Sequence, residues 1–237
     1  MQIPVVENVL KLNDEVAALN RQTLRALGLT TIDLIGAPGC GKTALLEATL
    51  RRLQGRLRLG VMAGDLTTTR DAQRLARFCP QVVQINTGRG CHLDANQVRQ
   101  AMSRLDLAHL DLLVIENVGN LICPVGFDLG QDLKVGMFSV TEGDDKPAKH
   151  PYIVAESSLL LLNKTDLLPY VSFSMDVFRR DVERLNPRVP LLTICATGDQ
   201  IDPWINWLLH AVAKPKSSAP GSETTAPKTS QTVPDSH

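Results

Sequence analysis

Short apolar runs alternate with stretches of helical periodicity along most of the chain. The apolar runs are continuous rather than alternating with polar residues, which is typical of strands covered on both faces. Strands that are separated by helical crossovers form parallel sheets. The sequence therefore predicts an α/β fold in which helices flank a mainly parallel sheet. The predicted strands cover 31–35, 59–63, 82–85, 112–115, 159–162 and 190–194, and the predicted helices between them cover 43–53, 70–78, 93–105, 174–185 and 202–212.

The two ends of the chain depart from this alternation. Apolar residues recur at helical spacing over 6–27, and Gly28 stands where that helix would end. From Lys214 to His237 apolar residues almost vanish, so this segment cannot bury enough surface to offset the entropy of ordering and is predicted to be disordered. The expected parts are an N-terminal helix (1–29) packed on the main domain, one α/β domain (30–213) and a disordered tail (214–237).

Composition narrows the class of protein. The 237 residues suffice for one α/β domain with a large core, and 25 basic residues balance 25 acidic ones. This balance gives no reason to expect nucleic acid or an anionic membrane as a partner. No apolar run is long enough to span a membrane, and no secretory signal is visible. The five cysteines are an odd number, which argues against a disulfide framework and favours a cytoplasmic protein with free thiols.

A complete phosphate-binding loop follows the first predicted strand. Residues 36–43 read G-A-P-G-C-G-K-T, which fits G-x-x-x-x-G-K-[ST], and a helical pattern follows. Backbone N–H groups of such a loop surround a β-phosphate, Lys42 reaches the β- and γ-phosphate oxygens, and the Thr43 hydroxyl can bind Mg²⁺. The sequence therefore predicts a three-layer P-loop NTPase with Lys42 as a catalytic residue. The residues expected to contact the nucleotide here are Gly36, Ala37, Pro38, Gly39, Cys40, Gly41, Lys42, Thr43 and Ala44.

A second motif, N-K-x-D, follows the predicted strand at 159–162 and indicates guanine. The carboxylate of Asp166 can accept hydrogen bonds from N1–H and the exocyclic amine of guanine, whereas adenine presents the wrong pattern on that edge. Asn163 and Lys164 are expected to brace the loop and cover the base. The alternative is a solvated turn that caps the next helix. The motif favours GTP and GDP as the ligands.

Two carboxylates follow predicted strands and are candidates for magnesium and catalysis. Asp65 and Glu116 stand at strand ends, and the carboxyl ends of parallel strands face the ligand crevice. Either could join Thr43 in holding Mg²⁺, which prefers oxygen ligands, or orient the attacking water. For Asp65 the alternative is a cap for a helical segment starting near Thr67.

A soft-ligand group is formed by Cys91, His92 and Cys123. Cys91 and His92 precede a predicted helix, where a thiolate would have a lowered pKa. Adjacent helical residues point about 100° apart, so these two alone would chelate poorly. Two chains around a two-fold axis would supply enough ligands for a four-coordinate site, which suggests a metal at a homodimer interface. The alternative is burial of the cysteines as small apolar residues. The remaining cysteines, Cys40, Cys79 and Cys195, are expected to be structural.

Several stretches together resemble the nickel-incorporation GTPases of nickel–iron hydrogenase maturation, which belong to the SIMIBI class of P-loop NTPases. The most specific stretches are C-H-L-D-A at 91–95 and E-N-V-G-N-L-I-C-P at 116–124, and the resemblance runs from about residue 5 to residue 212. The other matching stretches are Gly64-Asp65 with Asp71 downstream, N-T-G-R-G at 86–90, F-D-L-G at 127–130, and T-E-G-D-D-K-P at 141–147 ahead of His150-Pro151.

The resemblance implies a slow, homodimerising GTPase that delivers nickel to the hydrogenase large-subunit precursor, with a small zinc-containing accessory protein as partner. It implies that Cys91, His92 and Cys123 hold Ni²⁺ or Zn²⁺ near the dimer interface. Many family members carry an N-terminal cysteine motif or a His-rich stretch, but residues 1–35 contain no Cys and no His. We therefore expect no high-affinity nickel site there. Cys40 is unusual within the phosphate loop and is expected to be an accidental thiol.

Three other functions are less consistent with these motifs than a nickel-delivering GTPase. A urease-type nickel-insertion GTPase shares the phosphate loop and N-K-x-D, but the stretch at 116–124 favours the hydrogenase family. A small-molecule kinase is disfavoured by N-K-x-D and by the lack of an obvious basic lid. A metal-storage protein is disfavoured because no His-rich tract is present.

Overall fold

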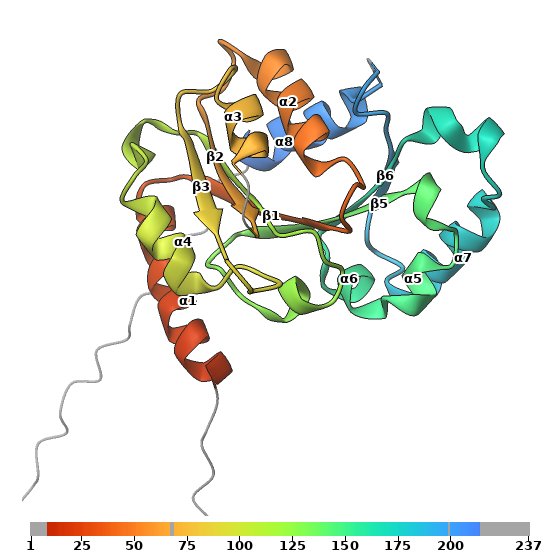
Figure 1. Cartoon of the computed structure of the whole chain (residues 1–237), viewed down its shortest axis with the longest axis horizontal. Coiled ribbons are helices and arrows are strands. Elements are labelled where there is room, and N and C mark those ends of the chain that lie inside the picture. The colour runs from red at the N-terminus through yellow and green to blue at the C-terminus, as the bar shows by residue number, and fades with distance from the viewer. Residues whose placement is uncertain (1–8, 67–68, 199, 214–237) are drawn as a thin grey trace, which may run out of the picture.

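The computed structural model describes residues 9–66, 69–198 and 200–213 and contains a single seven-stranded sheet in the order β3-β2-β4-β1-β5-β6-β7 (Figure 1). Every pair of neighbouring strands is parallel, and helices lie on both faces, which confirms the predicted α/β fold. The strands are β1 (Thr30–Gly36), β2 (Leu59–Asp65), β3 (Val82–Asn86), β4 (Leu112–Glu116), β5 (Leu133–Ser139), β6 (Leu159–Asn163) and β7 (Leu191–Thr193).

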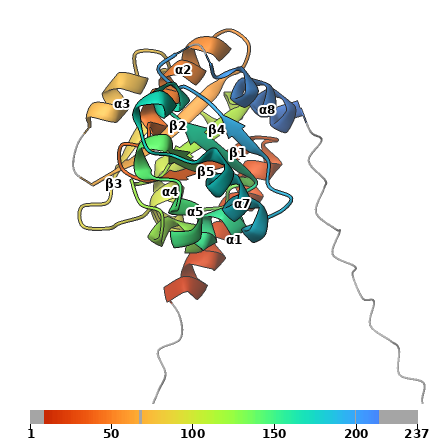
Figure 2. The same ribbon diagram turned by 90° about the vertical axis from the view of Figure 1, so that its right-hand side faces the viewer.

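The helices form two layers with the sheet between them (Figure 2). Side chains alternate along a strand, so Leu112 and Val114 of β4 pack toward α2, α3 and α8, whereas Leu113 and Ile115 pack toward α1 and α4. A third cluster of buried apolar side chains lies between β5 and β6 on one side and α6 and α7 on the other. The helices are α1 (Val9–Ala26), α2 (Lys42–Leu53), α3 (Arg70–Leu75), α4 (Ala95–Met102), α5 (Lys146–Lys149), α6 (Pro151–Glu156), α7 (Met175–Leu185) and α8 (Asp202–Ala213).

Strand β5, like the short helices α5 and α6, was not predicted from the sequence. It lies near the centre of the sheet, where it pairs with β1 and β6, and Val135 to Ser139 are buried. Its apolar run is broken by Lys134 and Gly136, so it lacks the continuous pattern of the other central strands. Pairing on both sides holds this segment as a strand despite the weak local signal.

Two helices are shorter than predicted because other residues define their ends. The Asp94 side chain accepts a hydrogen bond from the Gln97 backbone N–H, and the Gln97 side chain accepts one from the Asp94 backbone N–H, so this capping box starts α4 two residues after the predicted start. Helix α3 ends at Leu75 rather than at residue 78. The first helix ends as predicted, because Gly28 adopts a left-handed conformation with φ +69°.

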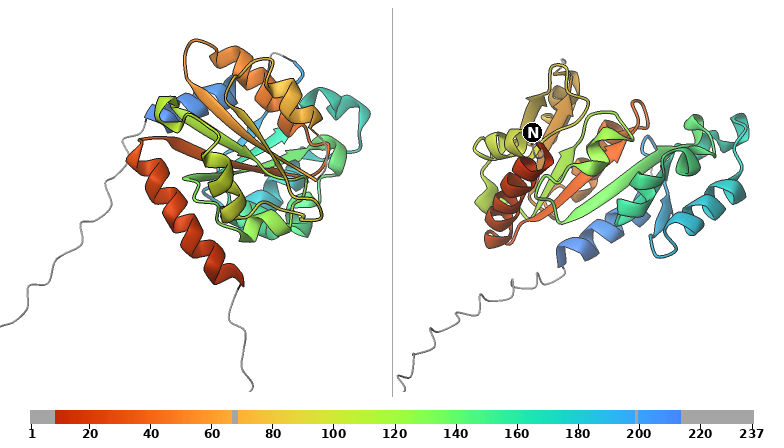
Figure 3. Two further views of the ribbon diagram at one scale, coloured as in Figure 1. Left: turned by 60° about the vertical axis from the view of Figure 1, so that its left-hand side comes forward. Right: turned by 90° about the horizontal axis from the view of Figure 1, so that it is seen from below.

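Helix α1 lies along one flank of the molecule and packs against α4 (Figure 3). Its inner face carries Ala17 and Leu24 and also two buried polar side chains, Asn13 and Asn20. The disordered tail predicted for 214–237, and residues 6–8 of the predicted first helix, lie outside the described residues. In the described part of the chain, no helix has both the length and the apolar character needed to cross a membrane.

Candidate functional site

The phosphate loop joins the carboxyl end of β1, at the centre of the sheet, to the start of α2. Gly41 has φ +105°, and a Cβ at this position would collide with the side-chain amide of Asn163, so only glycine fits. The Lys42 ammonium donates to the carbonyl oxygens of Gly36 (3.0 Å) and Ala37 (3.2 Å). These carbonyls hold the ammonium at the loop, where a phosphate could replace them as its partner.

Thr43 and Glu116, both predicted as magnesium ligands, are in direct contact. The Thr43 hydroxyl donates to Glu116 Oε1 at 2.7 Å, while Glu116 Oε2 is buried and lacks a hydrogen-bond partner among the described residues. Burial raises the pKa of Glu116 to about 7, against the opposing effects of the Thr43 hydrogen bond and the Lys42 charge. A buried, unsatisfied carboxylate oxygen beside a threonine hydroxyl is a donor set that fits Mg²⁺.

A cavity of about 380 Å³ lies against the loop and is lined by Lys42, Thr43, Glu116 and Asp65, among others. The carboxylate of Asp65 accepts the backbone N–H of Leu66 at 2.6 Å. The N-cap position of α3 is occupied by Thr69, so the alternative interpretation of Asp65 as a helix cap does not hold. Asp65 and Glu116 thus face the same cavity, as expected for strand ends in a parallel sheet.

The same cavity contains Arg74, which the sequence analysis did not identify. Its guanidinium binds both carboxylate oxygens of Glu47 at 2.9 Å and Asp71 at 3.2 Å, and these contacts raise the pKa of Arg74. The ion pairs hold the Arg74 guanidinium in place at the cavity wall. No local motif identifies Arg74 as a site residue. The sequence shows only that it stands three residues after Asp71, the spacing of an ion pair within a helix.

The N-K-x-D segment is bonded to the phosphate loop and to the segment after β7. Asn163 donates to the Cys40 carbonyl at 2.8 Å and accepts the Ala196 N–H at 2.9 Å, and its side chain is buried. Lys164 is the single non-glycine residue of the described chain with a positive φ, at +60°. The bonds of Asn163 link the two loops that would contact the phosphates and the base.

Cys195, which was expected to be structural, contacts a residue of the predicted guanine motif. Its thiol donates to Asp166 Oδ1 at 3.0 Å, so it contacts the carboxylate expected to bind guanine. Cys195 and Asp166 are 29 residues apart, and only the parallel pairing of β6 with β7 brings them together. The Cys40 thiol, by contrast, is fully buried, and burial raises its pKa to about 11, as suits an inert thiol.

Cys91, His92 and Cys123 converge. One potential ligand atom from each lies within 4.8 Å of the others, and Cys91 Sγ is 3.5 Å from His92 Nδ1. Cys91 and His92 precede α4 and are not on a helix, so the expected divergence of their side chains does not occur. The predicted lowering of the Cys91 pKa is also wrong: the neighbouring Cys123 thiol and partial desolvation raise it. A bound cation would offset this effect by stabilising the thiolates.

The imidazole of His92 packs against the ring of Phe127, with 3.8 Å between ring centroids and an interplanar angle of 32°. Burial against this ring lowers the pKa of His92, against the opposing charge of Asp94. A neutral imidazole is the form that binds a metal. Thiols and imidazole together form a ligand set for a borderline metal such as Ni²⁺ or Zn²⁺.

The segment from Glu116 to Cys123 connects the two candidate sites. The Asn120 backbone N–H donates to the Gly36 carbonyl at 3.1 Å, the same oxygen that accepts from Lys42. The Asn120 side chain donates to the Cys91 carbonyl at 3.3 Å and accepts the Ile122 N–H at 2.9 Å. One residue therefore contacts the phosphate loop and both segments that carry the candidate metal ligands.

A phosphate loop at the end of the central parallel strand, with a carboxylate beside its threonine and N-K-x-D bonded to it, defines a nucleotide-binding P-loop protein. The family model "CobW/HypB/UreG, nucleotide-binding domain" matches residues 30–193. Hydrogenase maturation factor HypB of Escherichia coli (strain K12) is 45% identical over 202 residues, which cover 85% of this chain and 70% of that protein. The chain belongs to the CobW/HypB/UreG family and, within it, to the hydrogenase maturation factors HypB.

Solved structures of this family have the same fold. The nickel complex of HypB from Helicobacter pylori is 32% identical with a TM-score of 0.81, over 85% of this chain and 95% of that one. HypB from Archaeoglobus fulgidus is 39% identical with a TM-score of 0.80, over 86% of this chain and the full length of that one.

Proposed function

We propose that this protein hydrolyses GTP and delivers nickel to the large-subunit precursor of a hydrogenase, with the metal held at a GTP-dependent homodimer interface. The observation that carries the proposal is the convergence of Cys91, His92 and Cys123 within 4.8 Å, with Asn120 hydrogen-bonded both to the Gly36 carbonyl of the phosphate loop and to the Cys91 carbonyl. The relatives named hydrogenase maturation factors, one of them a nickel complex, support the cargo and its destination.

In the proposed GTPase site, Lys42 leaves the Gly36 and Ala37 carbonyls and binds the β- and γ-phosphates, where it stabilises the charge of the transition state. Thr43 and Glu116 are the residues that would hold Mg²⁺, which neutralises phosphate charge. Asp65 faces the same cavity and orients the attacking water. On the guanine side, Asp166 accepts two hydrogen bonds from the base.

The same lysine movement connects nucleotide state to the metal site. When Lys42 leaves the Gly36 carbonyl, this oxygen no longer accepts from the ammonium and keeps its hydrogen bond from the Asn120 N–H. Gly119 packs so closely on Pro38 that a Cβ would lie 2.9 Å from the Pro38 Cα, so a shift of the phosphate loop is transmitted to this segment. Coupling of about 1–3 kcal/mol would be typical of such a linkage.

Dimerisation follows from the number of ligands. One chain offers three, and Cys91 is exposed, so a second copy can complete a four-coordinate site. In this proposal Ni²⁺ is the cargo, Zn²⁺ is the competing occupant, and a small zinc-containing accessory protein supplies nickel in the cytoplasm. The accessory protein rests on the family resemblance, and the compartment rests on the odd number of cysteines.

The test is to measure Ni²⁺ and Zn²⁺ affinity and particle mass in parallel, with GDP and with a non-hydrolysable GTP analogue. We expect a dimer with the GTP analogue and a nickel affinity that differs about 5- to 150-fold between nucleotides, the range of a 1–3 kcal/mol linkage. The Lys42→Ala variant, which removes the phosphate-binding ammonium, should abolish the difference. Equal nickel affinity in both nucleotides would contradict GTP-gated delivery.

A further inference from the structure

Two buried asparagines of α1 hold together the two segments that carry the metal ligands. Asn13 accepts the backbone N–H of Ala95 at 2.9 Å and donates to the Asp128 carbonyl at 2.8 Å. About two turns further along the same face of the helix, Asn20 donates to the Ala95 carbonyl at 2.8 Å and to the Leu129 carbonyl at 3.1 Å. Both side chains are at most 8% exposed. Each asparagine therefore joins a residue close to Cys91 and His92 to a residue of the segment that starts at Cys123.

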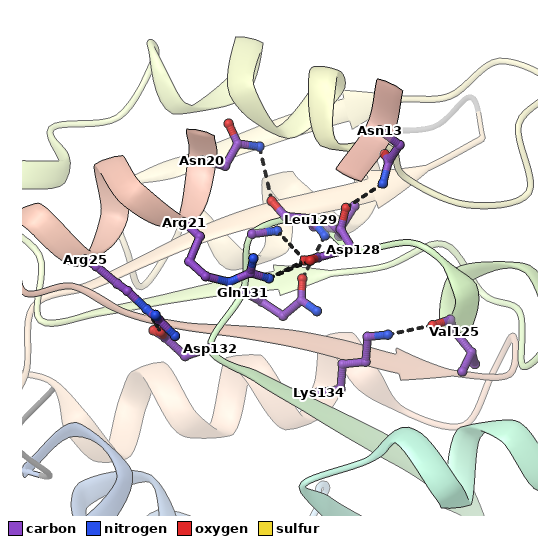
Figure 4. Close-up of polar contacts among 11 residues, drawn as sticks. Asn13, Asn20, Arg21, Arg25, Val125, Asp128, Leu129, Gln131, Asp132 and Lys134 are labelled. Carbon is purple, nitrogen blue, oxygen red and sulfur yellow. Dashed lines mark hydrogen bonds and ion pairs between the residues drawn. The ribbon is translucent and has the colours of Figure 1, made fainter. Parts of the chain in front are cut away.

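Arg21 adds a contact that reaches a ligand through one residue. Its guanidinium binds both carboxylate oxygens of Asp128, at 2.7 and 2.6 Å (Figure 4). Asp128 directly follows Phe127, whose ring packs on His92 at 3.8 Å between centroids. Both Arg21 contacts come from one nitrogen, Nη2, so this is a charge-assisted contact shared by the two oxygens, and the Gly130 N–H also donates to Asp128 Oδ1 at 2.9 Å. The pair therefore restrains the ring against which His92 lies.

Helix α1 precedes the domain that the family shares, since the family model begins at residue 30. Buried polar side chains are costly unless their hydrogen bonds are made, and an apolar face would suffice to pack a helix on α4. Asn13 and Asn20 instead direct their hydrogen bonds at the backbone of the two ligand-bearing segments, as Figure 4 shows for Asp128 and Leu129.

We propose that α1 is the positioning element of the metal site, with Asn13, Asn20 and Arg21 as its positioning residues. The three side chains contact no metal. They restrict the relative motion of residues 91–95 and 123–129, so the ligands are held near one another before the metal arrives and less conformational entropy is lost on binding. The identity of the metal rests on the proposed function; the positioning role does not.

The test compares two arginines on the same helix. Arg21→Gln removes the pair with Asp128, whereas the control Arg25→Gln removes an ion pair with Asp132, at 3.3 Å, which is four residues further from Phe127. We expect Arg21→Gln to weaken Ni²⁺ binding about 10-fold, the lower end of the range for residues that orient metal ligands, and Arg25→Gln to leave it unchanged. The double variant Arg21→Asp with Asp128→Arg should restore most of the affinity.

A metal-free readout separates positioning from general stability. In the metal-free protein, the rate at which oxidised glutathione converts Cys91 and Cys123 into a disulfide reports how often the two thiols meet. We expect Arg21→Gln and Asn13→Ala to slow this reaction several-fold while GDP affinity stays at the wild-type value. Wild-type nickel affinity and disulfide rate in a folded Arg21→Gln protein would overturn the inference. Failure of the wild-type protein to bind nickel would instead remove the proposed function and leave the disulfide comparison to decide the positioning role.

Discussion

The nucleotide site and the candidate metal site of this protein are built in opposite ways. The phosphate loop is one continuous segment whose backbone conformation is fixed by glycines and by the central strand beneath it. The metal site consists of three side chains from two segments, Cys91 is exposed, and neighbouring elements hold the segments in place. The first site is rigid because of its own sequence, and the second is positioned by contacts made elsewhere.

This difference suits the proposed roles. A site that stabilises a transition state benefits from groups that do not move. A site that must accept a metal and later release it benefits from ligands whose geometry responds to another event. Asn120, which contacts the Gly36 carbonyl on one side and the Cys91 carbonyl on the other, places the two sites in one hydrogen-bonded chain.

The largest expected effect is a double dissociation of the two sites. Lys42→Ala should weaken GTP binding by about 100-fold or more because the phosphates lose their cation, while nickel affinity without nucleotide is kept. Cys123→Ala should weaken nickel binding by about 100-fold or more through loss of a ligand, while GDP affinity is kept. Calorimetric titration of each variant with each ligand measures both. Loss of GDP binding in a folded Cys123→Ala protein would contradict the separation.

A substitution at Asp166 should change the base that the protein prefers from guanine to xanthine. Asp166→Asn replaces an acceptor by an N–H donor opposite the amino group of guanine, so GTP affinity should fall by about 100-fold or more. Xanthosine triphosphate, which has a carbonyl at that position, should then bind better than GTP. The Cys195 thiol can still donate to the asparagine oxygen, so the loop should keep its position. Competition between the two nucleotides measures the switch, and unchanged preference for GTP would exclude Asp166 from base recognition.

Glu116 should destabilise the nucleotide-free protein at alkaline pH. Its pKa is raised from 4.5 to about 7 in the folded state, so the unfolded state ionises first, the native state loses stability as the pH rises from about 4.5 to about 7, and the deficit stays constant above that. Glu116→Gln removes this cost and should raise the free energy of unfolding by about 1–3 kcal/mol at pH 8, with little effect at pH 4.5. Urea unfolding at both pH values tests the prediction. An equal change at the two pH values would show that ionisation of Glu116 is not the cause.

The smallest expected effect lies at Cys195. Cys195→Ala removes a thiol donor to Asp166 and should weaken GDP binding about 2- to 5-fold, as befits one weak hydrogen bond. Cys195→Ser supplies a stronger donor of similar size and should bind GDP at least as well as the wild-type protein. Fluorescent GDP titration resolves differences of this size. Identical affinities of all three proteins would show that the thiol does not position Asp166.

Most of the fold was predictable because its strands and helices carry their own patterns. Six of the seven strands, the end of α1 at Gly28 and the phosphate loop all follow from adjacent residues. Strand β5 was missed because Lys134 and Gly136 interrupt its apolar run, and its two neighbours in the sheet determine its conformation. Arg74 was missed because its place in the phosphate cavity depends on α3 packing beside α2.

The sequence by itself determined which chemical groups this protein has: a phosphate loop, a guanine motif, two strand-end carboxylates and three soft ligands. These groups can be identified from residue types and from short spacings along the chain. Only the tertiary structure decided that Cys91, His92 and Cys123 meet, that Cys195 contacts Asp166, and which elements hold the metal segments. Such contacts join residues up to 115 positions apart, as between Asn13 and Asp128, and packing of the whole domain brings them together.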